Sequence, residues 1–314
     1  MHVVVLAGGV GAARFLVGLQ QVVAPAGITA IVNVADDEVV SGLAISPDLD
    51  TILYTCTGAI DPERGWGLAG ETWRAMDEFR RLADASGHDE LAWFGLGDRD
   101  IGTHLYRTAR LGQGAALHEV SAELAAAWGL ELRLVPVSDD RIATRIDTAD
   151  GELAFQEYFV RERHDVTVRA ARFAGADDAT PAPGVLEAIA SADVVVIAPS
   201  NPIVSIGPVL AVPGVREAVT ARRDRVVAVS PIVGGKALKG PADRLLGDLG
   251  HESSVVGVAR LYRDVASTLV VDEIDEALLD AVEAEGMRAV ATPTIMSEPG
   301  VAAALARRCL EVVS

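Results

Sequence analysis

Residues 2–15 read HVVVLAGGVGAARF, an apolar run that leads through glycines into a helical pattern. This order is typical of the first strand, turn and helix of a Rossmann-like fold. Glycines let the backbone approach a ligand, and the helix N-terminus offers N–H groups to an anion. The loop lacks the full GxGxxG spacing, because Ala13 and Arg14 follow Gly11. A tight strand–helix turn without any ligand is therefore an equally good interpretation.

Similar Val- and Ile-rich runs recur along the chain. They are apolar at successive positions rather than at alternate ones, as in strands that are buried on both faces. These runs lie at 2–7, 28–34, 132–137, 193–199, 225–231, 267–272 and 288–292. Helix-like segments separate many of them, at 12–23, 183–191, 214–222, 241–249, 275–285 and 299–312. The alternation predicts an α/β fold, a doubly wound and mostly parallel sheet with helices on both faces.

The middle of the chain has a different pattern. Residues 60–130 predict mostly helix, with amphipathic segments at 68–85 and 118–130. Further on, IATRIDT and ELAFQEYFVRER flank the turn residues Ala-Asp-Gly at 149–151, which predicts antiparallel strands in a β-hairpin. We therefore expect a Rossmann-like nucleotide-binding core and an inserted region of helices and a hairpin. The core comprises residues 1–57 and 176–314, and the insertion comprises residues 58–175.

Composition excludes several classes of partner and site. The chain of 314 residues carries a formal net charge of −18, which argues against nucleic acid and against an anionic membrane. Its two cysteines, Cys56 and Cys309, do not suggest a disulfide framework or a zinc site. No run approaches the roughly 18 apolar residues that span a bilayer. The apolar start lacks a basic leader, so we expect a cytoplasmic protein without a signal sequence.

Five carboxylates gather in NVADDEVVSGLAISPDLDTILYT at 33–55. Mg²⁺ takes carboxylates from loops and completes its coordination with water and substrate phosphate. Asp36 from the first loop, with Asp48 or Asp50 from the next, is a sensible pair of ligands. Because Asp48 and Asp50 are two residues apart, they cannot share one face of a helix. At most one of these two is then a ligand, unless the helix starts later with Asp50 as its cap.

A structural interpretation of the same carboxylates competes with the metal site. Ser46 and Pro47 have the residue types of an N-cap and first turn, which predicts a helix that ends before Gly58. Asp48 in the first turn would then stabilise the helix dipole. For any single aspartate, capping or solvation is the simpler explanation.

Three further loops carry polar residues, and each has a structural alternative. WFGLGDRDIGTH (93–104) suggests a loop shaped around a ligand, although its charges can pair with one another. APSNPIVSIGP (198–208) places Ser200 and Asn201 at a strand's carboxyl end, where Asn201 can bind a ligand or form an Asx-turn. SPIVGGKALKGP (230–241) brings two lysines to an acidic protein, which suggests phosphate contact or only a solvated loop.

Several hydrolase and kinase signatures are missing from the sequence. We find no GxSxG, HExxH or GxxxxGK[ST] pattern, which disfavours a serine hydrolase, a zinc metalloprotease and a P-loop kinase.

Taken in order, these segments resemble one family across nearly the whole chain. The resemblance rests on GGVGAARF (8–15), NVADD (33–37), ISPDLDTILYT (45–55), WFGLGDRD (93–100), PVSDD (136–140), FQEYFVRER (155–163), APSNPIVSIGP (198–208) and SPIVGGKALKGPA (230–242). It is similar to the CofD/FbiA family of coenzyme F-420 biosynthesis. ISPDLDT, FQEYFV and SNPxxSI are the specific parts.

The resemblance implies a reaction and an architecture. Family members transfer a phosphoenolpyruvyl or 2-phospholactyl group from a guanosine-diphosphate donor to the terminal ribityl hydroxyl of the deazaflavin Fo, and GMP leaves. Mg²⁺ is required. The implied fold is a Rossmann-like core with an added helical region, and a homodimer is expected.

The resemblance also implies roles for particular residues. Asp36 and Asp50 would bind Mg²⁺, with Asp48 as a substitute, and one of the carboxylates, such as Asp37, would be the general base. The nucleotide and the phosphate or ribityl groups would contact Gly9, Gly11, Asn33, Ser200, Asn201, Ser230, Pro231, Ile232, Val233 and Lys236. The deazaflavin would contact a wall of Trp93, Gly97, Asp98 and His104.

Two other functions remain open at this stage. A related branch of the family resembles nucleotide-sugar-binding regulators without transferase activity. A nicotinamide-dependent oxidoreductase would use the glycine loop, with Asp36 as the acid at the end of the second strand. The residues leave undecided whether the donor carries enolpyruvate, lactate or glycerate. They also leave open which carboxylate is ligand and which is base.

Overall fold

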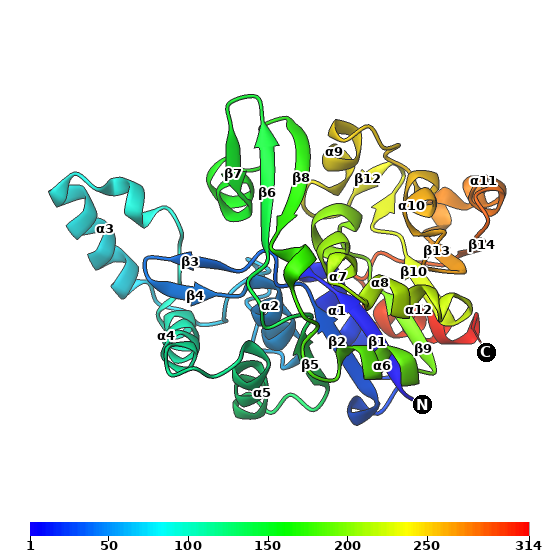
Figure 1. Cartoon of the computed structure of the whole chain (residues 1–314), viewed down its shortest axis with the longest axis horizontal. Helices are drawn as coiled ribbons and strands as arrows, with labels where there is room; N and C mark the ends of the chain where they lie inside the picture. The colour runs from blue at the N-terminus through cyan, green and yellow to red at the C-terminus, as the bar shows by residue number, and fades with distance from the viewer. Residues whose placement is uncertain (314) are drawn as a thin grey trace.

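Residues 1–313 are described by a computed structural model, and within them seven parallel strands form a central sheet in the order β14-β13-β10-β9-β1-β2-β5 (Figure 1). The strands are β1 (Val3–Ala7), β2 (Ile28–Val32), β5 (Arg133–Pro136), β9 (Val194–Ile197), β10 (Val226–Val229), β13 (Thr268–Val271) and β14 (Arg288–Ala291). Each strand falls inside one of the apolar runs, and the side chains of β1, β2, β9, β10 and β13 are buried throughout. The predicted doubly wound parallel sheet is confirmed.

The strand order reverses next to β1. This strand pairs with β2 on one side and with β9 on the other, and both pairings are parallel. The loops after β1 and β9 therefore diverge at the carboxyl edge of the sheet, which is where α/β proteins of this kind bind ligands.

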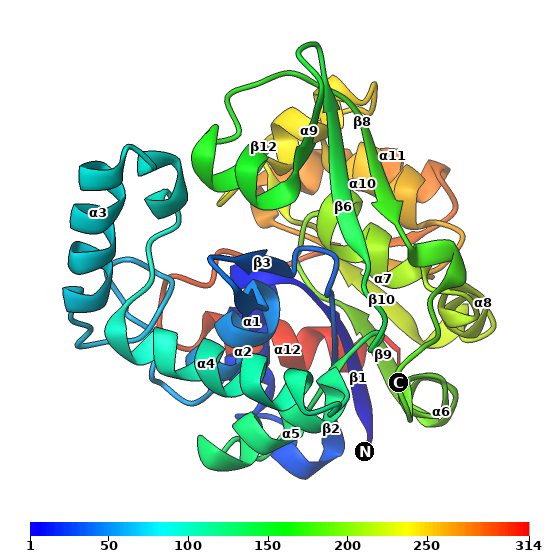
Figure 2. The ribbon, with the colours of Figure 1, turned by 60° about the vertical axis from the view of Figure 1, so that its left-hand side comes forward.

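Helices cover both faces of the sheet (Figure 2). One group contains α1 (Gly9–Leu19), α2 (Pro47–Cys56) and α12 (Val301–Glu311), and α1 packs against both of the others. The other side carries α6 (Val185–Ser191) and α8 (Val215–Thr220), which pack together. The remaining core helices are α7 (Gly207–Ala211), α9 (Ala242–Asp248), α10 (Val255–Tyr262) and α11 (Leu279–Ala284). Short 3₁₀ turns lie at Pro25–Gly27, Asp89–Ala92, Ala176–Asp178, Arg223–Arg225 and Glu273–Leu278.

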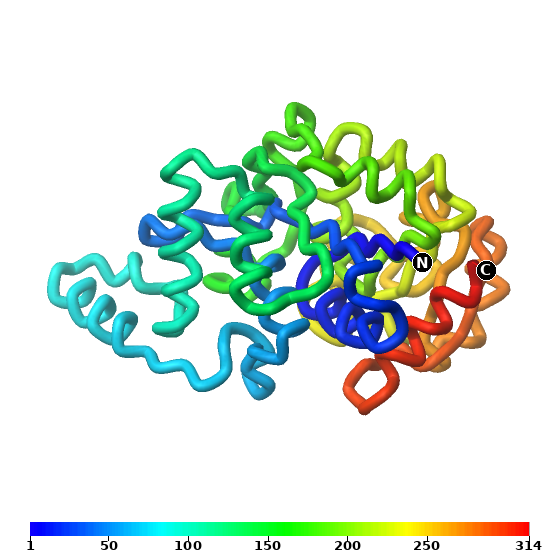
Figure 3. The backbone as a smooth tube through the Cα atoms, turned by 90° about the horizontal axis from the view of Figure 1, so that it is seen from below, coloured from blue at the N-terminus to red at the C-terminus, as the bar shows by residue number. Residues whose placement is uncertain are grey.

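The inserted region contains α3 (Arg74–Ser86), α4 (Asp98–Gly112) and α5 (Leu117–Ala127), and α3 projects from the body of the molecule (Figures 1 and 3). A hairpin of β3 (Glu38–Val40) and β4 (Leu43–Ile45), which the sequence did not suggest, packs against this region through Val40, Ile45, Met76 and Leu96.

Two expectations for this region are wrong. The helix predicted at 68–85 begins only at Arg74, and residues 98–104, expected in a loop, start α4.

The inserted strands form a small antiparallel sheet in the order β7-β6-β8. These are β6 (Ala143–Thr148), β7 (Glu152–Ala154) and β8 (Val168–Ala174). The hairpin turn at 149–151 is confirmed, but FQEYFVRER is wrong as a strand, because Glu157–Arg161 is a π-helical turn. Its Tyr158 is buried against residues of β6, the 202–206 turn and α9, and that packing outweighs local strand propensity.

The predicted insertion contains one strand of the core sheet. Strand β5 falls within residues 58–175 yet belongs to the central sheet, beside β2. A second short hairpin, β11 (Ile232–Val233) and β12 (Lys236–Ala237), lies in a segment that we expected to be a loop. Its turn uses Gly234 and Gly235, both with positive φ, as two-residue hairpins require. Within residues 1–313, no helix is long and apolar enough to cross a membrane.

Candidate active site

Asp48 joins three segments at the carboxyl edge of the sheet. Asn33, directly after β2, donates from its Nδ2 to Asp48 Oδ2 at 3.0 Å. The backbone N–H of Gly9, the first residue of α1, also donates to the Asp48 carboxylate. Burial raises the pKa of Asp48 to about 6, although these two hydrogen bonds oppose the rise. The carboxylate of Asp48 therefore occupies the N-terminus of α1, the position that a phosphate takes in many Rossmann-like folds.

Asp36 lies between the core and the antiparallel sheet. Thr144 of β6 donates to Asp36 Oδ1 at 3.2 Å, and Gln156 Nε2 donates to the Asp36 carbonyl at 2.9 Å. Burial, followed by repulsion from Asp48, raises the pKa of Asp36 well above its usual value. Two buried carboxylates that repel each other need either a proton or a cation between them.

Asp37 is half-buried, and one of its two carboxylate oxygens lacks a hydrogen bond from the described residues. Ser46 donates to Asp37 Oδ2 at 2.6 Å, while Oδ1 is buried and has no hydrogen-bond partner among residues 1–313. The pKa of Asp37 is raised well above its usual value, first by burial, and Asp50 and Asp48 add to the rise. The charge of Arg107 opposes this rise.

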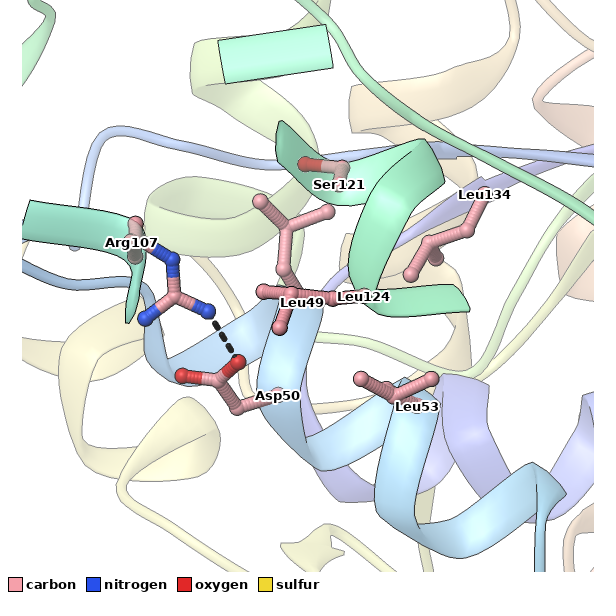
Figure 4. Close-up of a pocket in the computed structure, with 7 residues that line it drawn as sticks. All are labelled: Leu49, Asp50, Leu53, Arg107, Ser121, Leu124 and Leu134. Carbon is pink, nitrogen blue, oxygen red and sulfur yellow. Dashed lines mark hydrogen bonds and ion pairs between the residues drawn. The ribbon is translucent and has the colours of Figure 1, made fainter. Parts of the chain in front are cut away.

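Asp50 is neutralised by an arginine from the inserted region. The Arg107 guanidinium in α4 donates to Asp50 Oδ1, and both side chains are buried (Figure 4). Leu49, Leu53, Leu124 and Leu134 line the same pocket. The second oxygen, Asp50 Oδ2, has no hydrogen-bond partner within the described part of the chain. The Asp48 and Asp50 carboxylates thus have different neighbours, as their spacing on a helix required.

A histidine and a tyrosine extend this network. Arg107 Nη1 donates to His104 Nδ1 at 3.1 Å, and since a guanidinium only donates, the ring proton of His104 is on Nε2. That nitrogen lies 3.4 Å from Asp100 Oδ1, which also accepts from the Tyr54 hydroxyl at 2.8 Å. Burial alone would raise the pKa of Asp100, but His104, Tyr54 and Arg107 outweigh it and lower that pKa.

The carboxylate cluster, defined as Asp36, Asp37, Asp48 and Asp50, suits a hard divalent cation in its chemistry. Its possible metal ligands are oxygens, and two of them, Asp37 Oδ1 and Asp50 Oδ2, are buried without a hydrogen-bond partner among residues 1–313. His104 Nδ1 lies 3.8 Å from Asp50 Oδ2. Within the same range, no group of three or more His, Cys, Asp or Glu side chains is arranged to hold a metal. A cation held by two of these carboxylates would need water and substrate phosphates as its other ligands, as Mg²⁺ usually does.

The glycine loop brings the two loops of the switch point into contact. A Cβ on Gly11 would lie 2.0 Å from the carbonyl oxygen of Pro199, in the loop after β9. Ser200 Oγ in that same loop donates to the Gly8 carbonyl at 2.8 Å. Close backbone packing therefore explains Gly11, and the hydrogen bond to Gly8 explains Ser200, without a ligand.

Two other predicted nucleotide contacts, Asn201 and Ser230, also have partners within the chain. Asn201 Oδ1 accepts from the N–H groups of Ile203 and Val204, and the first of these bonds forms the Asx-turn that is the structural alternative for this residue. Ser230 Oγ donates to the carbonyl of Ile232 at 2.9 Å. Pro231 is half-buried, Ile232 and Val233 are buried in β11, and Lys236 is exposed in β12.

Gly97 and Asp98 have structural roles between α3 and α4. Asp98 accepts from the backbone N–H groups of Arg74 and Ala75 at the start of α3. In return, Glu71 accepts from the first N–H groups of α4, and a Cβ on Gly97 would lie 2.2 Å from the Glu71 side chain.

A cleft of about 340 Å³ lies beside the cluster. It is lined by Glu38, Val39, Val40, Ser41, Glu90, Leu91, Trp93, Arg145, Ala154, Gln156 and Glu157. Gln156 connects the cleft to the cluster, because its side chain also holds the Asp36 carbonyl. Of the four residues predicted to contact the deazaflavin, Trp93 alone lines the cleft within residues 1–313; His104 is buried in the arginine network.

Arg14, in the middle of α1, and Lys239 are close enough for their charges to repel each other. Burial and repulsion from Arg14 lower the pKa of Lys239. The Lys239 Nζ reaches the 61–67 segment, where a Cβ on Gly65 would lie 2.6 Å from it. Among residues 1–313, neither Arg14 nor Lys239 has a carboxylate within ion-pair distance. Unpaired neighbouring cations in so acidic a protein suit an anionic ligand.

The sequence analysis did not predict Arg107, Thr144, Gln156, Arg14 or Lys239 as site residues. Arg107 could have been found, since Asp100, His104 and Arg107 are four and then three residues apart and share one face of a helix. A loop was predicted for 98–104, and a loop has no helical face that these three residues could share.

Comparison with known proteins identifies relatives over the whole fold. Residues 3–307 match the family described as 2-phospho-L-lactate transferase CofD. A protein of Streptomyces griseus named phosphoenolpyruvate transferase is 47% identical over 99% of this chain and 98% of its own length. A protein of Mycolicibacterium smegmatis with the same name is 42% identical, again over 99% of this chain and 98% of its own length.

The fold also resembles a solved structure. The crystal structure of protein BH3568 from Bacillus halodurans matches with a TM-score of 0.63, over 98% of this chain and 99% of that one. The two sequences are 19% identical, so this likeness concerns the fold alone.

Proposed function

Because the chain belongs to the CofD family, we propose that it transfers a phosphoenolpyruvyl group from a guanosine-diphosphate donor to the ribityl hydroxyl of the deazaflavin Fo. Membership makes it a phosphoryl-group-transferring enzyme of coenzyme F-420 biosynthesis. Enolpyruvate is proposed over lactate because the relatives at 42–47% identity are named phosphoenolpyruvate transferase.

The observation that carries this proposal is the buried carboxylate cluster beside the cleft. Asp36 and Asp48 are both buried and repel each other, and this supports them as the pair that holds Mg²⁺. Asp50 is less suited than the resemblance implies, because Arg107 already binds one of its oxygens. When bound, Mg²⁺ would neutralise the donor phosphates and the charge that develops on the leaving GMP.

The cluster also offers a general base. Asp37 Oδ1 lacks a partner among residues 1–313, and the raised pKa of Asp37 brings its basicity closer to that of a base that works near neutral pH. We assign it the ribityl proton. The ribityl oxygen forms a bond to the distal phosphorus, the bond from that phosphorus to the GMP oxygen breaks, and the proton moves to Asp37.

Separate parts of the site would bind the two substrates. Trp93 and the cleft support an acceptor site for the flat deazaflavin, next to Asp36 through Gln156. Arg14 and Lys239 support a binding site for the donor phosphates, since such anions need local cations in a protein of net charge −18. A dinucleotide pyrophosphate at the start of α1 is disfavoured, because Asp48 occupies that position.

The test is a titration of the protein with Fo, followed by the fluorescence of Fo, with and without GDP and Mg²⁺. We expect saturable binding that GDP and Mg²⁺ strengthen. A transfer assay with the enolpyruvyl donor should then give a phosphodiester and GMP, and Asp36→Asn should abolish turnover while the far-UV spectrum is unchanged. Failure of Fo to bind under every condition would refute the proposal.

A further inference from the structure

Arg107 is the only lysine or arginine that is buried among residues 1–313. Its guanidinium makes three contacts, to Asp50 Oδ1, to the Ala44 carbonyl at 3.3 Å and to His104 Nδ1 at 3.1 Å. These contacts come from α2, β4 and α4, so the cation is fixed in place by the elements around it. An arginine does not lose its charge in a protein. The carboxylate cluster therefore contains one permanent positive charge.

That charge is effective because the surroundings exclude water. The Arg107 side chain is 2% exposed and lines a pocket together with Leu49, Leu53, Leu124 and Leu134 (Figure 4). Charges interact more strongly where the effective dielectric constant is low. A second cation close to Asp50 would meet this guanidinium at short range.

The arrangement also limits how many metal ions the cluster can share. In two-metal phosphoryl-transfer sites the ions are about 4 Å apart, so both need carboxylate oxygens in a small space. Here Arg107 takes one oxygen of Asp50, and Ser46 takes one of Asp37. Four ionised carboxylates and Arg107 carry a net charge of −3. One divalent cation brings the net charge of the cluster to −1, and two would make it +1.

We propose that Arg107 is a positioning residue and a fixed cation of the carboxylate cluster, so that the cluster binds one divalent cation rather than two. It holds Asp50 in one orientation and takes the place of a second metal ion. This inference rests on the magnesium site of the proposed function. It adds the number of ions and the residue that sets it.

The test is a Mn²⁺ titration of the purified protein without substrates, with free Mn²⁺ measured by electron paramagnetic resonance. Wild type should bind one ion. Arg107→Met should bind two, because the repelling charge is gone and both Asp50 oxygens are free. Arg107→Lys keeps the charge and should still bind one. Arg110→Met, on the same helix but in the exposed pair with Glu123, is the matched control and should also bind one.

A double variant keeps the test decisive if Arg107→Met does not fold. Asp50→Asn with Arg107→Met removes both charges and should again bind one ion, on Asp36 and Asp48. A double variant that binds none would contradict the inference, since Asp50 would then be a ligand. Two ions on wild type, or one on folded Arg107→Met with unchanged affinity, would also overturn it.

The number of Mn²⁺ ions bound tests this inference separately from the proposed transfer reaction. A protein that binds one ion as described but transfers nothing to Fo would refute the proposed reaction and leave the role of Arg107 intact. A wild type that binds no ion would refute both the magnesium site and this inference.

Discussion

Asp50 in the first turn of α2 and Arg107 in α4 form an ion pair whose side chains are 8% and 2% exposed. This pair links the inserted helices to the core. Removing one partner of a buried pair strands the other charge, so Arg107→Met should lower the free energy of unfolding by about 3–5 kcal/mol. Asp50→Asn with Arg107→Met should lose less, because no unpaired charge remains. Urea unfolding of both variants in EDTA measures this.

Arg110→Met is the control for this prediction. It breaks an ion pair with Glu123 on the same helix, but those side chains are 31% and 34% exposed. Such a pair contributes at most about 1 kcal/mol. If Arg110→Met and Arg107→Met lost equal stability, the buried pair would have no special place in the fold.

Asp48 predicts a pH dependence of stability in the absence of metal. Its pKa is raised to about 6 in the folded protein from an ordinary value of 3.8, first by burial. A raised pKa stabilises the folded state below the unfolded value and loses that contribution as pH rises through the folded value. Between pH 4 and 7, wild type should therefore lose about 2 kcal/mol relative to Asp48→Asn. Urea unfolding in EDTA across that range measures the difference, and parallel profiles for the two proteins would contradict it.

The central sheet could be predicted because its signal is local. A strand buried on both faces must be apolar at each position, so β1, β9 and β10 can be predicted from their continuous apolar runs without knowledge of their neighbours. The conformation of residues 155–163 could not be predicted in this way. Its aromatic residues have strand propensity, and only packing onto β6 and α9 makes the segment a π-helical turn.

The candidate site divides along the same line. Asp36, Asp48 and Asp50 were predicted from loops that follow strands, since parallel strands bring their carboxyl ends to one edge. Arg107 lies 57 residues after Asp50 in sequence, and Thr144 and Gln156 are more than 100 residues from Asp36. Such contacts depend on how the inserted region folds back onto the core, which no spacing in the sequence reports.

Gly11 should tolerate no side chain. A Cβ there would lie 2.0 Å from the Pro199 carbonyl oxygen, and backbone cannot move aside as a flexible side chain can. Gly11→Ala should lower the free energy of unfolding by about 1–3 kcal/mol, as overpacking does. Gly102, in the exposed interior of α4, is the matched comparison, because a Cβ there would meet nothing within 4 Å. Gly102→Ala should instead stabilise the protein by about 1 kcal/mol. Thermal and urea unfolding of the two variants would show opposite signs; a stabilising Gly11→Ala would contradict the observed contact.

Replacing Lys239 and replacing Lys236 should have different effects on donor binding. Lys239 lies close to Arg14 without an acidic partner among residues 1–313, and burial together with the repulsion between them lowers the pKa of Lys239. An anion between the two cations would relieve that repulsion and gain charge-assisted hydrogen bonds, each contributing about 1.5–3 kcal/mol. Lys239→Ala should therefore weaken GDP binding, measured by calorimetry, by roughly 10- to 150-fold.

Lys236→Ala is the matched comparison, because the resemblance assigned the nucleotide to that lysine. Both lysines are exposed, but it is Lys239 that is repelled by a neighbouring cation, Arg14. The loss of Lys236 should therefore change GDP affinity by less than about threefold. A larger loss in Lys236→Ala than in Lys239→Ala would return the phosphate site to β12. Raising the salt concentration should reduce the difference between wild type and Lys239→Ala, since ions screen exposed and half-exposed charges. A difference that salt leaves unchanged would mean that Lys239 acts by shaping the loop and not by its charge.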